Sequence, residues 1–416
     1  KAPLKYNGLL PWEILLSESQ ERMSLAVPPG KYDALLVLAK KREVEVTILG
    51  MFNDSGTVEI RHGTKIVAML DIDFLHEGLP EMILDAYWTP PPTELDVDFT
   101  PPDSRGILLQ LLADPNIASK ESLVRQYDHE VQALTVGKPF VGRCNDGPSD
   151  GAVLRPLSQS LRGVTITHGI CPWYSNYDTL RMAMCAVDEA VRAHVAIGGN
   201  PDRMAALDNF CWPDPVSADF DSASSYKLAQ LVRAARGLQE ACLAYRLPLI
   251  SGKDSMKNDA VVDGRKISIL PTLLVSLLGI VEDLSKSVST DFKLVGDKIF
   301  VIGPDKGELG ETAYARTLAA KLGACPSVDP GAAMVRYRLL HSAICADMIS
   351  SAHDISDGGL MISLSEMCLA SNLGFTFIEK NNSHAFLFGE DQGRYLISFK
   401  GNLYNKNMKY FKKNKI

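Results

Sequence analysis

Four short polar segments of the sequence carry side chains that could bind a ligand or a metal ion. The first, Ser17-Glu18-Ser19-Gln20-Glu21-Arg22, places a carboxylate, a hydroxyl and an amide in succession. Such groups can hold a polyhydroxylated ligand through hydrogen bonds. A solvated turn is the alternative, and spacing alone favours the turn.

The second segment runs from Asn145 to Ala152 and contains two glycines and two aspartates ahead of an apolar run. Carboxylates presented at a turn suit Mg²⁺, which prefers oxygen ligands and usually also contacts substrate phosphates. An Asx-type turn without a ligand explains the composition equally well. Asp150 is the candidate metal ligand of this segment.

The third segment is a predicted helix over 178–196. Its apolar stripe consists of Leu180, Met184, Val187, Val191 and Val195. Asp188, Glu189 and Arg192 lie off this stripe, and Glu189 could join Asp150 at a metal ion. A surface salt bridge between Asp188 and Arg192, four residues apart, is the ordinary alternative and would stabilise the helix only slightly.

Two predicted loops rich in small residues form the fourth group. Ser251-Gly252-Lys253-Asp254-Ser255 follows an apolar run. Its glycine would let the backbone approach a phosphate and its lysine adds positive charge, although the P-loop pattern is absent. In His353-Asp354-Ile355-Ser356-Asp357-Gly358-Gly359, the aspartates could bind Mg²⁺ and Ser356 could contact a nucleotide. Capping of the following helix by these side chains is the alternative, which spacing alone slightly favours.

The composition excludes several classes of function. The 416 residues are 46% hydrophobic and 22% charged, with a net charge of −7, so the chain is an ordinary globular protein without the basic surface that nucleic acid requires. No run of about 18 apolar residues and no signal peptide are present, so we expect no membrane association. A cytoplasmic location is therefore expected.

Eight cysteines are scattered without a CxxC pair, which favours reduced thiols over a zinc or redox site. Cys171 is a weak candidate nucleophile, because a nucleophile needs a positioned base and the sequence offers only His168 nearby.

The remaining pattern predicts the elements that position these segments. Residues 86–103 are rich in proline and form the predicted linker. Helices are expected over Tyr32–Lys41, Leu228–Cys242 and Leu360–Leu373, and a hairpin over Thr57–Leu70. Strands are expected over Val44–Ile48, Met204–Leu207, Lys298–Gly303, Phe375–Ile378 and Tyr395–Phe399, and a strand or strand pair over Ile267–Val281. Mixed helices and strands predict an α+β fold in paired layers.

The ends of the sequence predict a piece of a longer polypeptide. The first residue is Lys1 rather than Met, and the last residues, KNMKYFKKNKI, read as the start of an unfinished basic helix.

Five segments, taken in order, resemble one enzyme family. They are LLPWEILLSESQERM, AVDEAVRAHVAIGGNPDRMAALDNF, PLISGKDSM, HDISDGGL and GEDQGRYLIS. Together they are similar to the second half of the phosphoribosylformylglycinamidine synthase family, within the aminoimidazole ribonucleotide synthetase superfamily. The first and last of these segments are closer to the small-subunit form, whereas GKDSM is closer to the large single-chain form.

The resemblance implies an internally duplicated architecture, in which each half has a sheet-rich N-terminal domain and an α+β C-terminal domain. Residues 1–85 would end the first C-terminal domain, 104–288 would form the second N-terminal domain, and 289–416 would form a truncated second C-terminal domain. The implied reaction converts formylglycinamide ribonucleotide, ATP and glutamine-derived ammonia into the amidine, ADP and phosphate, with Mg²⁺ positioning the phosphates.

The resemblance also implies roles for individual residues. Formylglycinamide ribonucleotide would be bound by Glu18, Ser19, Gln20 and Ser255. Nucleotide would be bound by Lys120, Asp208, Gly252, Lys253 and Ser356. Metal would be bound by Asp150, Glu189 and Asp354, which in the large form surround a Mg–nucleotide of largely structural role.

Two departures from the family pattern weaken the expected metal sites. Lys253 stands where the small form has an asparagine ligand, and a charged lysine cannot ligate Mg²⁺. Ala193 stands where the large form has an asparagine one turn after the glutamate. The family's catalytic histidines lie in the first half, so no catalytic residue is assigned and this segment alone is expected to be inactive.

The expected partners are a glutaminase subunit and a small accessory subunit that supply ammonia. Two alternatives remain open from the sequence. The chain could be a catalytically inert half whose bound nucleotide maintains its shape, or a related ATP-using synthetase with another substrate.

Overall fold

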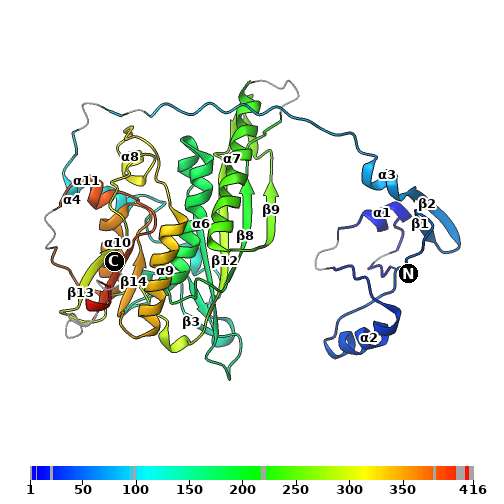
Figure 1. Cartoon of the computed structure of the whole chain (residues 1–416), viewed down its shortest axis with the longest axis horizontal. Helices are drawn as coiled ribbons and strands as arrows, with labels where there is room; N and C mark the ends of the chain where they lie inside the picture. Colours follow the sequence, from blue (N-terminus) through cyan, green and yellow to red (C-terminus); the bar gives the residue numbers. More distant parts are fainter. Residues whose placement is uncertain are drawn as a thin grey trace. The chain divides into compact units, whose positions relative to one another are not determined.

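The structure, a computed structural model, describes residues 2–5, 7–18, 22–93, 95–96, 100–216, 222–377, 381–399 and 408–411. The chain forms two compact units, Lys1–Leu84 and Asp85–Ile416 (Figure 1). All the predicted site residues other than Glu18, Ser19 and Gln20 belong to the second unit.

The first unit combines short helices with one hairpin. Its elements are α1 (Pro11–Leu16), η1 (Pro29–Lys31), α2 (Tyr32–Lys41), β1 (Thr57–His62), β2 (Lys65–Asp71) and α3 (Ile72–Glu77). The predicted helix and hairpin are both confirmed, because β1 and β2 pair antiparallel. The turn between them contains Gly63 with φ +65°, a left-handed value that glycine adopts without strain.

The strand predicted over Val44–Ile48 is wrong, because these residues belong to no strand. The backbone N–H of Val44 instead donates to the carbonyl of Ala39 at the end of α2. Alternating apolar residues form a strand only where a neighbouring strand completes the hydrogen-bond ladder. Among the described residues of this unit, only Ala39 is buried, so the unit has very little core of its own.

The described residues of the predicted linker form no regular helix or strand, yet the first part of the linker packs on other residues of the second unit. The indole of Trp88 stacks on Tyr226 at 5.3 Å, and the guanidinium of Arg233 lies 4.4 Å from the indole ring centre. Further along, Leu95 forms an isolated bridge with Leu322. These contacts replace the freely solvated spacer that proline-rich composition indicates.

The second unit is built on a six-stranded sheet. The strand order is β3 (Thr135–Gly137), β6 (Ala152–Leu154), β7 (Gly163–Ile170), β12 (Thr272–Val281), β8 (Met204–Cys211) and β9 (Leu249–Ser255). All neighbours are antiparallel except β8 and β9, which are parallel. A parallel pair needs a long crossover, and α7 (Ser222–Tyr245) supplies it.

Helices cover one face of this sheet. The helix α6 (Thr179–Ala196) packs on β7 and β12, and α7 and α9 (Pro330–Cys345) pack beside it (Figure 1). The expected helix over 178–196 is confirmed, and Asp178 caps it by accepting a hydrogen bond from the N–H of Leu180. Burial alternates along β12, so one face of the sheet meets the helices while the other stays more open.

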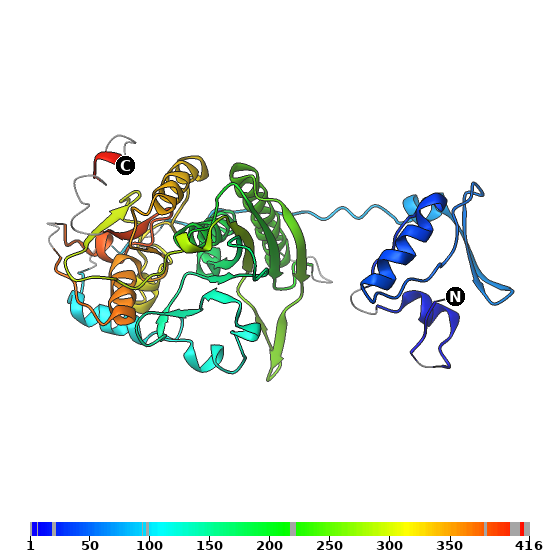
Figure 2. The ribbon, with the colours of Figure 1, turned by 90° about the horizontal axis from the view of Figure 1, so that it is seen from below.

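A smaller sheet and several helices complete the unit (Figure 2). The sheet has the order β13 (Lys298–Ile302), β15 (Tyr395–Phe399) and β14 (Ser351–Asp354). The remaining elements are α4 (Ser104–Ala113), α5 (Glu121–Val124), η2 (Val131–Ala133), β4 (Phe140–Val141), β5 (Gly147–Pro148), η3 (Pro172–Asn176), β10 (Asp259–Val262), β11 (Arg265–Ser268), η4 (Leu284–Lys286), α8 (Ala313–Thr317), α10 (Gly359–Ser371) and α11 (His384–Phe388).

Several predicted boundaries need correction. The expected loop 251–255 is most of the edge strand β9, and Asp208 lies inside β8 rather than after it. Residues 375–377 form no strand, and Ile378 lies outside the described residues. The segment 267–281 splits into β11 and β12, as the expected strand pair.

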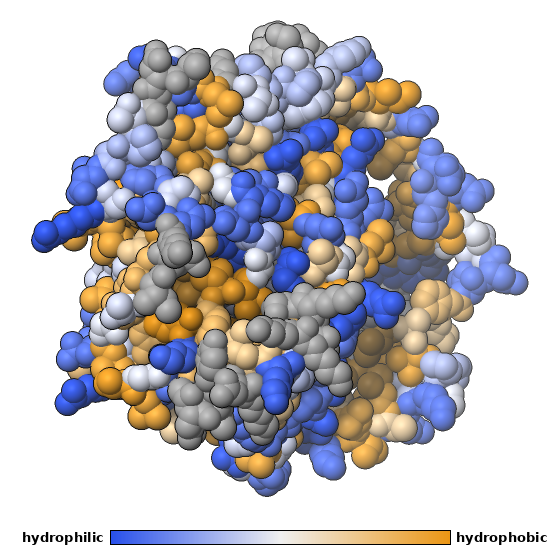
Figure 3. Space-filling model, turned by 60° about the vertical axis from the view of Figure 1, so that its left-hand side comes forward, coloured by the Kyte–Doolittle hydropathy of each residue, from blue (hydrophilic) through white to orange (hydrophobic). Residues whose placement is uncertain are grey.

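The α+β fold class is confirmed. The largest buried cluster draws on residues from both 104–288 and 289–416, so these two parts of the second unit share one core. Figure 3 shows one face of the molecule, on which hydrophobic residues are interspersed among hydrophilic ones. No helix within the described part of the chain is long and apolar enough to cross a membrane.

Candidate functional site

Two of the predicted metal ligands meet beside the β14–α10 loop. Asp150 lies two residues before the start of β6, and Asp354 is the last residue of β14. With His353 they form a group whose potential ligand atoms all lie within 4.8 Å of one another. The Asp150 side chain is 1% exposed, so these groups face each other in the interior.

His353 bridges two carboxylates. Its Nδ1 lies 2.5 Å from Oδ1 of Asp150, and its Nε2 lies 2.9 Å from Oε2 of Glu366. Although burial lowers it, the charge of Asp150 and the hydrogen bonds to both carboxylates raise the pKa of His353 well above its ordinary value. His353 therefore holds Asp150 in place through a hydrogen bond, a role that sequence spacing did not assign.

Arg192 connects the helix α6 to the same group. Its Nη1 donates to Asp188 over 2.5 Å and to Gln392 over 2.9 Å, while its Nε donates to Asp354 over 3.2 Å. The expected salt bridge between Asp188 and Arg192 is present, but the expectation that it lies on the surface is wrong, because both side chains are buried. A buried pair of this kind depends on complete hydrogen bonding, which Tyr245 adds by donating to Asp188.

Glu189 lies near this group but is not one of the three residues, Asp150, His353 and Asp354, whose potential ligand atoms lie within 4.8 Å of one another. Its Oε2 accepts a hydrogen bond from the N–H of Ile170 over 2.7 Å. Burial raises the pKa of Glu189 to about 8, and the charges of Asp357 and Asp354 add to the rise. Burial likewise raises the pKa of Asp150 to about 7, against the opposing charge of His353.

The donor set fits a hard divalent cation. Burial, and to a smaller extent neighbouring carboxylates, raise the pKa values of Asp150 and Glu189, and a bound cation would favour their charged forms. Asp150 and Asp354 offer the carboxylate oxygens that Mg²⁺ prefers, together with phosphate oxygens of a ligand. His353 and Arg192 contact the same carboxylates from outside, as hydrogen-bonding partners that orient metal ligands do.

A second group of predicted residues meets at the edge of the large sheet. Asp208 on β8 pairs with Gly252 on β9, and Asn209 pairs with Lys253. A Cβ atom at position 252 would lie 2.7 Å from Oδ1 of Asp208, so the glycine makes room for this carboxylate. Burial raises the pKa of Asp208, and the charge of Asp254 adds to it.

One row of residues runs across the sheet between the two groups. Gly252 pairs with Asp208, Asp208 with Val275, and Val275 with Gly169. A Cβ atom at position 169 would lie 2.9 Å from the Cβ of Glu189. Gly169, which packs against Glu189, is therefore two strands away from Asp208 in this row. Neighbouring strands lie about 4.8 Å apart.

The other predicted site residues belong to neither of these two groups. Lys120 is exposed and donates to the carbonyl of Ala118. Ser356 is half-buried, and its carbonyl accepts from the N–H of Gly359. Glu18 is exposed in the first unit, whereas Ser19 and Gln20 lie outside the described residues. Ser255 ends β9.

Two alternatives from the sequence can be settled. Capping of α10 by Asp354, Ser356 or Asp357 is wrong, because its N-cap is Gly358, in the left-handed conformation with φ +76°. Cys171 does not have the character of a nucleophile, because burial and the charge of Glu189 raise the pKa of its thiol well above the ordinary value.

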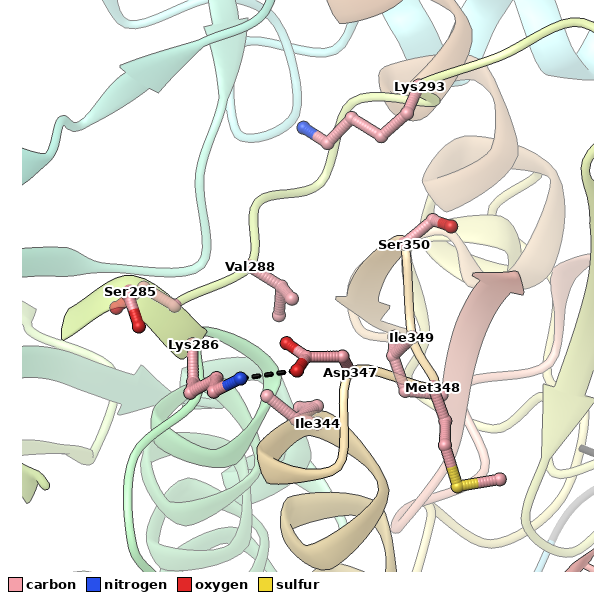
Figure 4. Close-up of a pocket in the computed structure, with 10 residues that line it drawn as sticks. Ser285, Lys286, Val288, Lys293, Ile344, Asp347, Met348, Ile349 and Ser350 are labelled. Atoms are coloured by element: carbon pink, nitrogen blue, oxygen red, sulfur yellow. Dashed lines mark hydrogen bonds and ion pairs between the residues drawn. The ribbon is translucent and has the colours of Figure 1, made fainter. Parts of the chain in front are cut away.

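A pocket of about 260 Å³ lies elsewhere in the second unit (Figure 4). Its walls include an ion pair between Lys286 and Asp347, with Val288 and Met348 as apolar neighbours. None of its lining residues belongs to a predicted site.

Glu390 and Asp391 have structural roles that were not predicted from the sequence. Glu390 is buried, and its carboxylate accepts from the hydroxyl of Tyr174 and from the N–H groups of Ala313 and Gly358. Burial raises its pKa to about 7. A signal was available, because 390–394 repeats the E-x-Q-x-R spacing of 18–22.

Comparison of the sequence with known proteins gives consistent matches. The family described as AIR synthase related protein, C-terminal domain, matches residues 1–63 and 295–416. Phosphoribosylformylglycinamidine synthase subunit PurL of Rhodospirillum rubrum is 33% identical over 407 residues, covering 96% of this chain and 52% of the relative. The same subunit of Rhodopseudomonas palustris is 32% identical over 407 residues, with the same coverage.

The chain therefore spans about half the length of the curated relatives that it matches. Solved structures of Thermotoga maritima PurL are also similar. The complexes with ADP and with FGAR have TM-scores of 0.56 and 0.55, each at 20% identity, covering 96% of this chain and 55% and 54% of those chains. At this identity the likeness shows a shared fold.

Proposed function

We propose that this chain, which matches the AIR synthase related family over residues 1–63 and 295–416, forms the later half of a phosphoribosylformylglycinamidine synthase. The proposed enzyme is a cytoplasmic ligase of de novo purine biosynthesis. It converts formylglycinamide ribonucleotide, ATP and ammonia into formylglycinamidine ribonucleotide, ADP and phosphate. In this reaction the γ-phosphoryl group activates the amide oxygen of the substrate, and ammonia then displaces phosphate.

The convergence of Asp150 and Asp354 is the observation that carries this proposal within the structure. The two residues are 204 positions apart, yet they meet with His353 inside 4.8 Å. Buried carboxylates beside a fixed arginine are suited to a nucleotide with its metal ion, since such sites work by position and charge.

Further residues complete the proposed site. We assign Asp150, Glu189 and Asp354 to the metal, and Lys120, Asp208, Gly252, Lys253 and Ser356 to the nucleotide. When bound there, Mg²⁺ would neutralise phosphate charge. Arg192 and His353 would keep the two aspartates oriented through the hydrogen bonds described above.

We also propose four residues that bind the substrate. Glu18, Ser19 and Gln20 offer hydrogen-bonding groups to formylglycinamide ribonucleotide, and Ser255 offers a hydroxyl. A glutaminase subunit and a small accessory subunit are the proposed source of ammonia. We assign no catalytic residue to this segment and expect it to be inactive alone.

A second candidate function is a catalytically inert half that holds a nucleotide for stability. Its support is the hydrogen bonding of Asp150 to His353 and of Asp354 to Arg192, which already compensates part of the charge. Lys253 adds to this support, because its ammonium group would repel a cation. Purified protein would then retain ADP without hydrolysing ATP.

ADP release by the intact gene product tests the proposal. With Mg-ATP and ammonium chloride, we expect ADP release only when formylglycinamide ribonucleotide is added. Glu18→Ala should raise the KM for this substrate, whereas Asp202→Asn, in an exposed ion pair with Arg338, should leave the kinetics unchanged. ADP release that ignores the substrate would contradict the synthase, and retained ADP without turnover would favour the inert half.

A further inference from the structure

Three consecutive backbone amides converge on the carboxylate of Asp391. The N–H groups of Lys306 and Gly307 donate to its Oδ2 over 2.8 and 3.1 Å, and that of Glu308 donates to its Oδ1 over 2.8 Å. Gly307 has φ +67°, a left-handed value that glycine adopts without strain. Successive amides arranged in this way form a concave nest for an anion.

A buried arginine adds positive charge to the same place. Nη1 of Arg394 lies 3.6 Å from Oδ2 of Asp391, and both side chains are fully buried. Nη1 also donates to the carbonyl of Gly389 over 3.4 Å. Nε and Nη2 of Arg394 have no hydrogen-bond partner among the described residues. Arg394 therefore carries two donors that the carboxylate of Asp391 does not satisfy, and buried donors without acceptors are costly.

The E-x-Q-x-R motif that contains Asp391 occurs a second time in the sequence, with another residue at the position of Asp391. Residues 390–394 read E-D-Q-G-R and residues 18–22 read E-S-Q-E-R. Each copy follows a short helix, α11 and α1 respectively, and both fall within the segments that match the same family description. Ser19 therefore stands where Asp391 stands in the later copy, so the earlier copy lacks the built-in anion.

We infer that the amides of residues 306–308, with Arg394, form a phosphate-binding cradle that the chain's own Asp391 keeps filled. Asp391 acts there as an internal ligand. This inference goes beyond the proposed synthase site, which uses neither Asp391 nor the loop 305–308. The ligand class is a tetrahedral phosphate oxyanion, whose additional oxygens would take up the donors of Arg394 that a carboxylate leaves unused.

Replacement of Asp391 by the residue of the earlier copy tests the inference. Asp391→Ser in the full chain should lower the thermal unfolding midpoint in chloride buffer, because three amides and Arg394 lose their anion. Inorganic phosphate at equal ionic strength should raise that midpoint in a saturable way. Calorimetric titration should show phosphate binding at least about tenfold tighter than to wild type.

Matched variants separate the cradle from a general salt effect. Asp391→Ala should respond to phosphate as the serine variant does. Asp391→Asn keeps a side chain of the same shape in the nest, so it should exclude phosphate and show no phosphate effect beyond that of chloride, although its neutral amide offers only one acceptor oxygen. Wild type should behave like the asparagine variant, because its cradle is already filled.

Three results would overturn the inference. The first is that the serine and alanine variants fold but respond equally to phosphate and chloride. The second is that wild type gains as much stability from phosphate as these variants do. The third is that neither variant folds even in phosphate, since a free anion would then be unable to replace the carboxylate of Asp391.

Discussion

Nε of Arg192 donates to Oδ2 of Asp354 over 3.2 Å and thereby joins α6 to the end of β14. The same guanidinium is held by Asp188 and Gln392. One side chain thus links the helical layer of the large sheet to the loop that precedes α10. The acidic group of the proposed site is consequently fixed by the fold before any ligand arrives.

Loss of this arginine should strongly destabilise the protein. In Arg192→Met the buried carboxylates of Asp188 and Asp354 lose their countercharge, which typically costs about 3–5 kcal/mol. Urea unfolding of the second unit measures the change in the free energy of unfolding. The exposed pair of Arg338 with Asp202 provides the control, because Arg338→Met should cost less than about 1 kcal/mol. Equal losses in the two variants would show that Arg192 is no structural link.

His194 should make stability depend on pH. Its buried ring accepts from Thr165 at Nδ1 and donates to the carbonyl of Asn200 from Nε2, and burial lowers its pKa from 6.5 to about 4. Between these two values the unfolded chain binds a proton that the folded chain does not. The stabilising contribution is therefore complete above pH 6.5 and is lost as the pH falls to about 4.

The His194→Gln variant isolates this effect from other titrating groups. The difference in free energy of unfolding between wild type and variant should shrink by roughly 3 kcal/mol over this pH range. Urea unfolding at several pH values gives the difference directly. Parallel stability curves for the two proteins would mean that His194 does not titrate in this way.

Trp88 should control how firmly the linker lies on the second unit. Its indole contacts Tyr226 and Arg233, and such contacts contribute about 1–2 kcal/mol together. Trp88→Ala should therefore speed proteolytic cleavage of the linker severalfold. The neighbouring Tyr87 is exposed and holds Ser225 through its backbone N–H, so Tyr87→Ala is the matched control and should leave the rate nearly unchanged. A cleavage rate in Trp88→Ala no faster than in this control would contradict the fixed linker.

Elements with a strong local pattern were predictable from the sequence. The helix Tyr32–Lys41 and the hairpin around Gly63 follow from apolar spacing and turn residues, and both are confirmed. The expected strand at Val44–Ile48 is wrong because a strand depends on a partner that local spacing does not reveal. Residues 251–255 read as a loop because they are small and polar, yet β8 provides a parallel neighbour for them.

The candidate site was predictable in its residue types but only partly in its geometry. Asp150 and Asp354 were chosen for the chemistry of their segments, and the fold brings them together. The link from Arg192 to Asp354 spans 162 positions and leaves no trace in helix spacing. The repeated E-x-Q-x-R spacing marks the segment of Asp391, but its role was not predictable, because its partners are backbone amides whose direction depends on the loop at Gly307.

Calorimetric titration of ADP into the full chain, with and without Mg²⁺, tests the proposed Mg–nucleotide site most directly. Wild type should bind ADP at least about tenfold more tightly with Mg²⁺, and Asp354→Asn, checked for native circular dichroism, should lose that difference. Asp202→Asn should keep it. Equal binding with and without Mg²⁺, or an unchanged Mg²⁺ effect in Asp354→Asn, would contradict the assignment of Asp150 and Asp354 to a metal-bound nucleotide.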